Sequence, residues 1–283
     1  MSINQIIIYK LLLMNSFIGG IIFMFYDMPS IYKNALQVLS ATGQLGEGKA
    51  DSNEPTETAK NIKDFGMIEV VNSKDPANYI QTINIIGQIE GHGVSSPQTK
   101  STKYEHVIPQ LIAMEQNPNV KGVLITLNTL GGDVEAGLAI AEMINSLSMP
   151  TVSLVLGGSH SIGVPLATAS DYAFITPSAT MILHPIRMNG LIIGVPQTFD
   201  YFKKMQERIN DFIIRTSSIK KEVLEGLLQE TGDLLNDMGT ILIGQEAVDR
   251  GLIEEVGGIT DALKKLNSMI EEKEKSSKKS DKN

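Results

Sequence analysis

The chain has 283 residues, of which 42% are hydrophobic, and this is enough for one sizeable core with tails. It contains no Cys, which excludes disulfide bonds, a thiol nucleophile and Cys-based zinc sites. A formal net charge of -8 argues against nucleic acid as a partner. The four His residues lack the spacing of metal ligands, so we expect neither a metal nor a cofactor.

The N-terminal segment, residues 1–26, is largely apolar and is interrupted by Lys10. Its length is close to the roughly 20 apolar residues of a membrane-spanning helix. Three interpretations stay open: a membrane anchor, a helical extension, and translated sequence upstream of a true start at Met24 or Met28. The protein is therefore expected in the cytoplasm or, through this segment, in contact with a membrane.

Composition divides the remainder of the chain into three parts. Residues 27–67 include a polar stretch rich in Gly, Glu, Lys and Asn, which predicts a linker or disordered arm. Residues 68–270 form the predicted folded domain. Residues 271–283 are rich in Lys, Ser and Glu and predict a charged, disordered tail.

Within the domain, apolar runs alternate with segments of helical periodicity. Strands are predicted at residues 80–86, 122–127, 151–156, 172–176 and 180–183. Helices are predicted at residues 104–115, 134–147, 162–168, 196–216 and 220–229, and within 246–253, where a Gly ends the helix. Repeated strand–helix–strand units predict an α/β fold with a largely parallel sheet.

Ser161 is the candidate nucleophile. It follows a predicted strand and Gly157-Gly158, and it stands at the start of a helix, where free N–H groups favour a developing negative charge. A second glycine turn, Gly131-Gly132, is predicted at the same end of a neighbouring strand. The N–H groups of Gly131 or Gly132 and of Ile162 are therefore candidate oxyanion donors. The alternative is that Ser161 is only a helix cap.

His184 is the candidate general base, because it lies at a strand end downstream of Ser161. His160 is its rival, although a residue adjacent to the nucleophile usually points elsewhere. Asp237 is the first candidate for the carboxylate that orients the His, and Asp233 is the second. The remaining His residues are expected at the surface, and they are His92 and His106.

Several of these segments, in this order, resemble ClpP-type serine peptidases of the crotonase-like superfold over about residues 80–262. The matching segments are Gly131-Gly132 with Ala136-Gly137, Ser161-x-Gly163, Pro177 through Ile182, and Glu246-Ala247 through Gly251-Leu252. The N-terminal arm and the Gly239-Thr240 region look more like the translocation-enhancing branch of that family.

The resemblance implies a spiral of βαβ units with a long protruding helix and a triad of Ser161, His184 and Asp237. It also implies an extended polypeptide substrate and a homo-oligomeric ring, with ring-to-ring contacts from residues 190–216. An AAA+ unfoldase is the usual partner of such rings, but here the N-terminal arm replaces the short loops that contact it.

The sequence departs from the family pattern at the triad. His184 directly precedes Pro185, whereas the family has one residue between them, and a one-residue shift turns a strand side chain to the other face. His184 is therefore competent only if the strand bends or bulges. The Asp237 region also needs an insertion of about two residues to align with the downstream Glu246-Ala247.

Two further functions stay open. Residues 169–180 are also similar to the Ser/Lys peptidases related to signal peptide peptidase A, which an N-terminal anchor would favour. The displaced His184 and the uncertain Asp motivate a third function, a non-catalytic translocation or assembly factor that binds protein segments without cutting them.

Overall fold

The computed structural model describes residues 69–72, 75–93, 95–96, 98–187, 194–232 and 238–280, all within one compact unit, Pro55–Asn283. The predictions for residues 1–26 and 27–67 lie outside the described residues, as do Asp233 and Asp237. Among the described helices, none is both long enough and apolar enough to cross a membrane.

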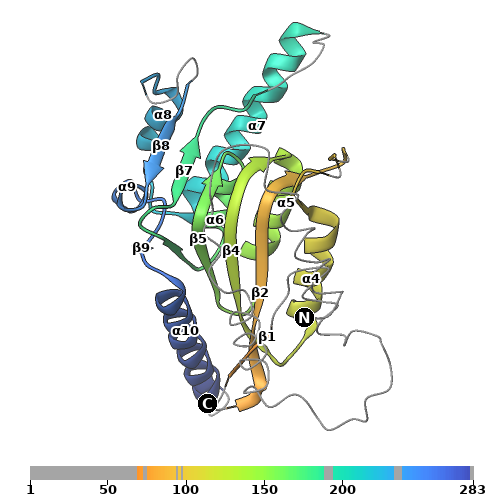
Figure 1. Cartoon of the computed structure of the whole chain (residues 1–283), viewed down its shortest axis with the longest axis vertical. Coiled ribbons are helices and arrows are strands. Elements are labelled where there is room, and N and C mark those ends of the chain that lie inside the picture. Colours follow the sequence, from red (N-terminus) through yellow and green to blue (C-terminus); the bar gives the residue numbers. More distant parts are fainter. Residues whose placement is uncertain are drawn as a thin grey trace, which may run out of the picture. The chain divides into compact units, whose positions relative to one another are not determined.

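One sheet forms the centre of this unit (Figure 1). Its described strands are β1 (Glu69–Asn72), β2 (Asp75–Glu90), β3 (Ser101–Lys103), β4 (Val120–Gly132), β5 (Thr151–His160), β6 (Tyr172–Ile175), β7 (Thr180–Leu183), β8 (Thr240–Ile243) and β9 (Glu255–Val256). The strand order is β1-β2-β4-β5-β6-β9, and β2, β4, β5, β6 and β9 run parallel. The predicted α/β fold with a largely parallel sheet is thereby confirmed.

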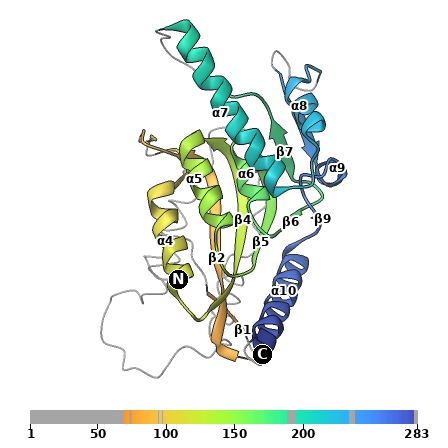
Figure 2. The same cartoon turned by 180° about the vertical axis from the view of Figure 1, so that it is seen from behind.

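Helices cover both faces of the sheet (Figure 2). They are α4 (Tyr104–Gln116), α5 (Val134–Asn145), α6 (Gly163–Thr168), α7 (Val195–Thr216), α8 (Lys221–Gln229), α9 (Gln245–Asp249) and α10 (Ile259–Ser280). Along β4, Val123 and Ile125 belong to the core shared with α4 to α8, whereas Leu124 packs with Ala262 and Leu266 of α10. Both faces of β4 are thus buried, which explains its continuous apolar run.

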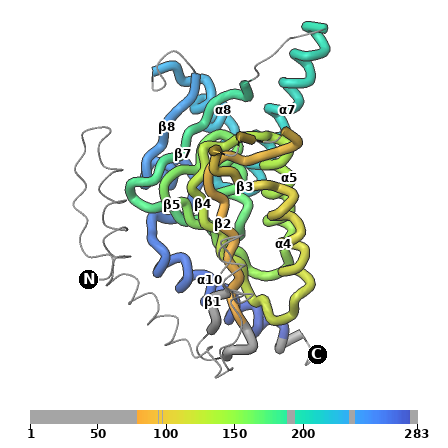
Figure 3. The backbone as a smooth tube through the Cα atoms, turned by 45° about the vertical axis from the view of Figure 1, so that its right-hand side comes forward, coloured from red at the N-terminus to blue at the C-terminus, as the bar shows by residue number. Residues whose placement is uncertain are grey.

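Three predicted strands end too early, because β2 runs to Glu90 and β4 and β5 also continue, and the difference in β5 moves the turn before Ser161. β5 continues through Gly157-Gly158 to His160, because these residues form a bulge rather than a turn. Leu127 of β4 pairs with Val155, and Thr129 pairs with Ser159, so the extra residues lie on β5. β4 likewise continues to Gly132. The bulge carries β5 to the side of β7, which pairs with β5 and β8 (Figure 3).

The disordered tail predicted from residue 271 is also corrected, because α10 is helical up to Ser280. Glu and Lys are good helix formers, and opposite charges one turn apart add support, as with Glu271 and Lys275 at 3.9 Å. In α10, the segment rich in Lys, Glu and Ser is therefore an exposed helix.

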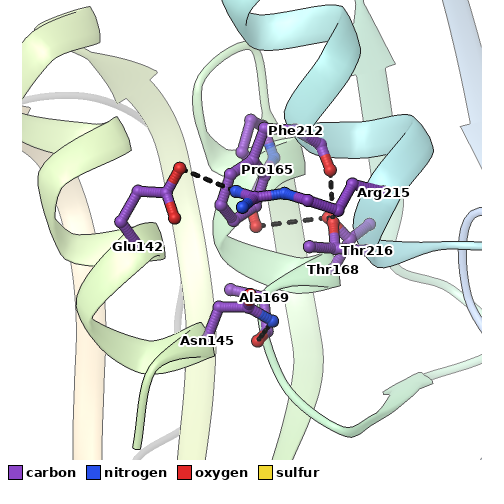
Figure 4. Close-up of polar contacts among 8 residues, drawn as sticks. All are labelled: Glu142, Asn145, Pro165, Thr168, Ala169, Phe212, Arg215 and Thr216. Atoms are coloured by element: carbon purple, nitrogen blue, oxygen red, sulfur yellow. Dashed lines mark hydrogen bonds and ion pairs between the residues drawn. The ribbon is translucent and has the colours of Figure 1, made fainter.

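Polar contacts fix α7 against α5 and α6 (Figure 4). Arg215 of α7 pairs with Glu142 of α5 at 2.6 Å. At the end of α6, the hydroxyl of Thr168 lies 2.8 Å from the hydroxyl of Thr216 on α7. Because α6 begins two residues after Ser161, these contacts also set the position of α7 relative to the candidate nucleophile.

Candidate active site

Ser161 lies in the turn between β5 and α6 and has a φ of +56°. It is the only non-glycine residue with a positive φ in the part of the chain that the structure describes. Its N–H donates to the carbonyl of Ile182 on β7 at 2.8 Å, and its carbonyl accepts from the N–H of Val164 at 3.0 Å. The turn is therefore held from both sides, and the Ser161 side chain is half-buried.

Ser161 does not act as the cap of α6. The N-cap is Ile162, and no side chain caps this helix. Ser159, two residues earlier, is fully buried, and its hydroxyl donates to the carbonyl of Gly163 at 2.6 Å. The hydroxyl of Ser159 is thus engaged in a local hydrogen bond, and Ser161 remains the candidate nucleophile in this turn.

Gly131 approaches this turn closely. A β-carbon at Gly131 would lie 2.7 Å from the His160 carbonyl oxygen and 2.8 Å from the Ser161 β-carbon, and its φ of +87° favours glycine. The Gly131 N–H donates to the hydroxyl of Thr129 at 3.1 Å. Gly131 is buried and Gly132 is exposed, so the two glycines differ in their exposure beside Ser161.

A cavity of about 210 Å³ adjoins Ser161. It is lined by Gly132, Val134, Ser161, Ile162, Val164, Leu183, His184, Ile186, Arg187, Gln206, Ile209, Asn210, Ile213 and Leu228. The turn, the end of β7 and one face of α7 therefore meet here. The structure brings together the predicted Ser161, His184, Gly132 and Ile162 on the walls of one cavity.

His184 follows the last residue of β7, Leu183. Consecutive residues of a strand point to opposite faces, yet both of these residues line the cavity. The ladder of β7 ends at Leu183, so His184 lies outside the strand and the alternation of strand side chains does not decide which way it points. His184 Nδ1 lies 2.7 Å from the carbonyl oxygen of Pro185. A carbonyl oxygen can only accept a hydrogen bond, so Nδ1 carries the proton in this contact. In the neutral imidazole, Nε2 then has a lone pair and can act as the base.

His160 occupies a different environment. Its Nε2 lies 2.7 Å from the hydroxyl of Thr180, and it does not appear among the described residues that line the cavity. Burial lowers the pKa of His160, and the nearby His184 lowers it further. His92 and His106 are exposed, as the sequence predicts.

Sequence reasoning missed Gln206 and Asn210 of α7. The side-chain amide of Gln206 accepts from the Ile186 N–H at 2.7 Å and donates to Asn210 Oδ1 at 2.8 Å. A sequence signal was present: Gln206 and Asn210 are two amide side chains four residues apart, which places them one turn apart on the predicted helix. No group of His, Asp and Glu among the described residues has the geometry of a metal site.

Comparisons with known proteins identify the family to which this chain belongs. A family model described as Clp protease matches residues 81–260. Translocation-enhancing protein TepA of Halalkalibacterium halodurans is 52% identical over 225 residues, which are 77% of this chain and 88% of that protein. ATP-dependent Clp protease proteolytic subunit 1 of Chlamydia muridarum is 26% identical over 168 residues, 57% of this chain and 83% of that protein.

A solved structure of a ClpP1 mutant from Listeria monocytogenes has the same fold. Its TM-score is 0.52 at 24% identity, over 64% of this chain and 94% of that one. The ClpP-like fold that the sequence motifs imply is therefore confirmed.

Proposed function

Because this chain belongs to the Clp protease family, we propose that it is a serine endopeptidase that hydrolyses peptide bonds in extended polypeptides. One observation carries the proposal: Ser161, in a strained turn, lines the same cavity as His184. Strained backbone conformations cluster at functional sites, and acyl transfer needs a nucleophile and a base that can meet in one cavity.

In the proposed reaction, Ser161 Oγ attacks the scissile carbonyl carbon while His184 Nε2 takes the hydroxyl proton. The carbonyl π electrons move to oxygen, and the N–H groups of Gly132 and Ile162 are the proposed donors to this oxyanion. Gly131 is the weaker candidate donor, because its N–H already bonds to Thr129.

Collapse of the intermediate breaks the C–N bond, and His184 gives its proton to the leaving amine. Water then attacks the acyl-enzyme, with His184 again as base. The carboxylic acid product departs, and Ser161 regains its proton.

Asp237 is the proposed third member of the triad, with Asp233 as the alternative. A carboxylate there would accept from His184 Nδ1–H and stabilise the imidazolium. Since Nδ1 already lies 2.7 Å from the Pro185 carbonyl oxygen, the carboxylate would share the Nδ1 proton with that carbonyl.

The proposed working form is a homo-oligomeric ring, as in relatives of the Clp protease family. Ring-to-ring contacts are assigned to residues 190–216, and an AAA+ unfoldase is a candidate partner that the chemistry does not require.

Labelling with a fluorophosphonate probe tests the proposal. The assembled wild-type protein should be labelled, Ser161→Ala should not be, and His184→Ala should react more slowly by about 10²-fold or more. Ser159→Ala is the matched control, because its buried hydroxyl is turned to Gly163, and it should still be labelled. A wild-type protein that stays unlabelled while assembled would refute the peptidase.

A Ser/Lys mechanism is less well supported. Among the described residues that line the cavity, the cation is Arg187, and no Lys is present. Full labelling of His184→Ala, together with loss in a Lys→Ala variant, would favour it.

The second candidate function is a non-catalytic factor in protein translocation. It is favoured by the 52% identity to a protein named for enhancing translocation. Secretion that is lost on deletion of the protein but restored by Ser161→Ala would identify this function.

A further inference from the structure

We propose that Gln206 is a positioning residue for His184, and that Asn210 fixes the amide of Gln206 for this role. The inference rests on the proposed peptidase function and adds to it the groups that orient its base. These groups come from α7, far along the chain from the turn that holds the nucleophile.

The first step is that the segment after His184 needs a tether. The ladder between β7 and β8 ends at the pair Leu183 and Thr240, so His184 lies beyond it. Pro185 has no N–H, and the N–H of Ile186 is therefore the first backbone donor after His184. That N–H donates to Gln206 Oε1 at 2.7 Å. Gln206 thus holds the chain at the first backbone N–H after His184.

The second step joins this tether to the imidazole. The carbonyl of Pro185 and the N–H of Ile186 belong to one planar peptide unit, which is trans. The two groups therefore point in opposite directions, and fixing the N–H fixes the C=O. Since His184 Nδ1 lies 2.7 Å from that carbonyl oxygen, the orientation of the peptide unit sets the ring orientation and tautomer.

The third step concerns which end of the Gln206 amide faces Ile186. Gln206 Nε2 donates to Asn210 Oδ1 at 2.8 Å, and this leaves Oε1 as the atom toward Ile186. Both side chains are half-buried and line the cavity with His184. Their helix is anchored one residue away by the buried Met205.

Substitutions at Gln206 separate this role from general packing. Gln206→Met keeps the size and removes the acceptor, whereas Gln206→Glu keeps an acceptor for the Ile186 N–H. We expect Gln206→Met to lower kcat for peptide hydrolysis and the maximal labelling rate of Ser161 by about 10- to 100-fold with little change in KM. Gln206→Glu should recover most of that rate. Glu207→Gln, at the neighbouring exposed position, is the matched control and should react like wild type.

Nitrogen-15 NMR of the His side chains is the second measurement, and it does not depend on activity. In the wild type, His184 should be the Nδ1–H tautomer at pH 8, and Gln206→Met should show a mixture of tautomers. Equal rates for Gln206→Met and Glu207→Gln, or an unchanged tautomer, would overturn the positioning role while leaving the peptidase intact. If the wild type is never labelled, the peptidase proposal fails and the NMR result alone decides the role of Gln206.

Discussion

Ser161 carries a β-carbon in a backbone conformation that suits glycine. At its φ of +56°, the β-carbon crowds the following carbonyl oxygen, which costs about 1–2 kcal/mol. Hydrogen bonds to Ile182 and from Val164 hold the residue there. The strain falls on a residue that lines the cavity together with His184, so the sequence keeps a serine where glycine would be more stable.

This strain predicts a difference between two inactive variants. Ser161→Ala keeps the β-carbon and Ser161→Gly removes it, so Ser161→Gly should be more stable by about 1 kcal/mol. Urea unfolding at one fixed protein concentration measures the difference. Neither variant should react with a fluorophosphonate. Equal stabilities would mean that the turn relaxes in solution, and the strain argument would then be wrong.

The sequence predicts those site residues that lie at the ends of neighbouring parallel strands. Gly132 ends β4 and Ser161 follows β5, and these neighbouring parallel strands have their carboxyl ends at one edge of the sheet, so the meeting of the two residues could be expected. Gln206 could not be expected in the same way. Its partner is the backbone N–H of Ile186, and which N–H lacks a ladder partner depends on where β7 ends. Asp237 stays a prediction, outside the described residues.

At the scale of elements, ion pairs tie α7 to α5. Arg208 donates twice to Glu135, at 2.7 and 3.0 Å, and Arg215 pairs with Glu142 at 2.6 Å. All four side chains are about half exposed, so water and salt screen each pair. The paired geometry of Arg208 and Glu135 places this pair at the stronger end of such contacts.

A double-mutant cycle on Arg208→Gln and Glu135→Gln should give a coupling energy of about 0.5–1 kcal/mol at neutral pH. The hydrogen bonds from Arg208 lower the pKa of Glu135. The stability contributed is therefore fully present above the unfolded-state pKa of about 4.3 and is lost as pH falls through the lower folded-state pKa. Chemical unfolding at several pH values measures this. A coupling energy that survives in acid, or in 1 M NaCl, would contradict an electrostatic origin.

Most elements follow from the sequence, and the errors have local causes. Helices begin where expected, as at Asp133, whose side chain accepts from the Ala136 N–H at 2.8 Å and caps α5. The end of β5 was missed because Gly157-Gly158 reads as a turn, and only pairing with β4 and β7 reveals a bulge. α10 was not predicted, and its C-terminal half was taken for a disordered tail because a charged composition is typical of both a solvated helix and a disordered tail.

At the scale of the whole molecule, the N-terminal end of α7 exposes large apolar side chains. Its buried residues, Met205, Phe212 and Ile213, belong to its C-terminal two-thirds. Toward its N-terminus, the side chains of Val195 and Phe199 are 69% exposed. Apolar side chains of this size in one place mark interaction sites. A second copy is the expected occupant, because the chain belongs to a family of ring-forming peptidases.

Phe199→Glu should therefore weaken contacts between rings while leaving the fold intact. A charge buried without a partner opposes association by several kcal/mol, so the proposed stack of two rings should separate toward half its mass. Sedimentation velocity measures the mass, and circular dichroism checks the fold. Ile112→Glu is the matched control, because Ile112 is 51% exposed on α4, outside residues 190–216. If Phe199→Glu leaves the mass unchanged, or if Ile112→Glu lowers it equally, then the exposed end of α7 is not the contact between rings, and another face of the molecule must carry assembly.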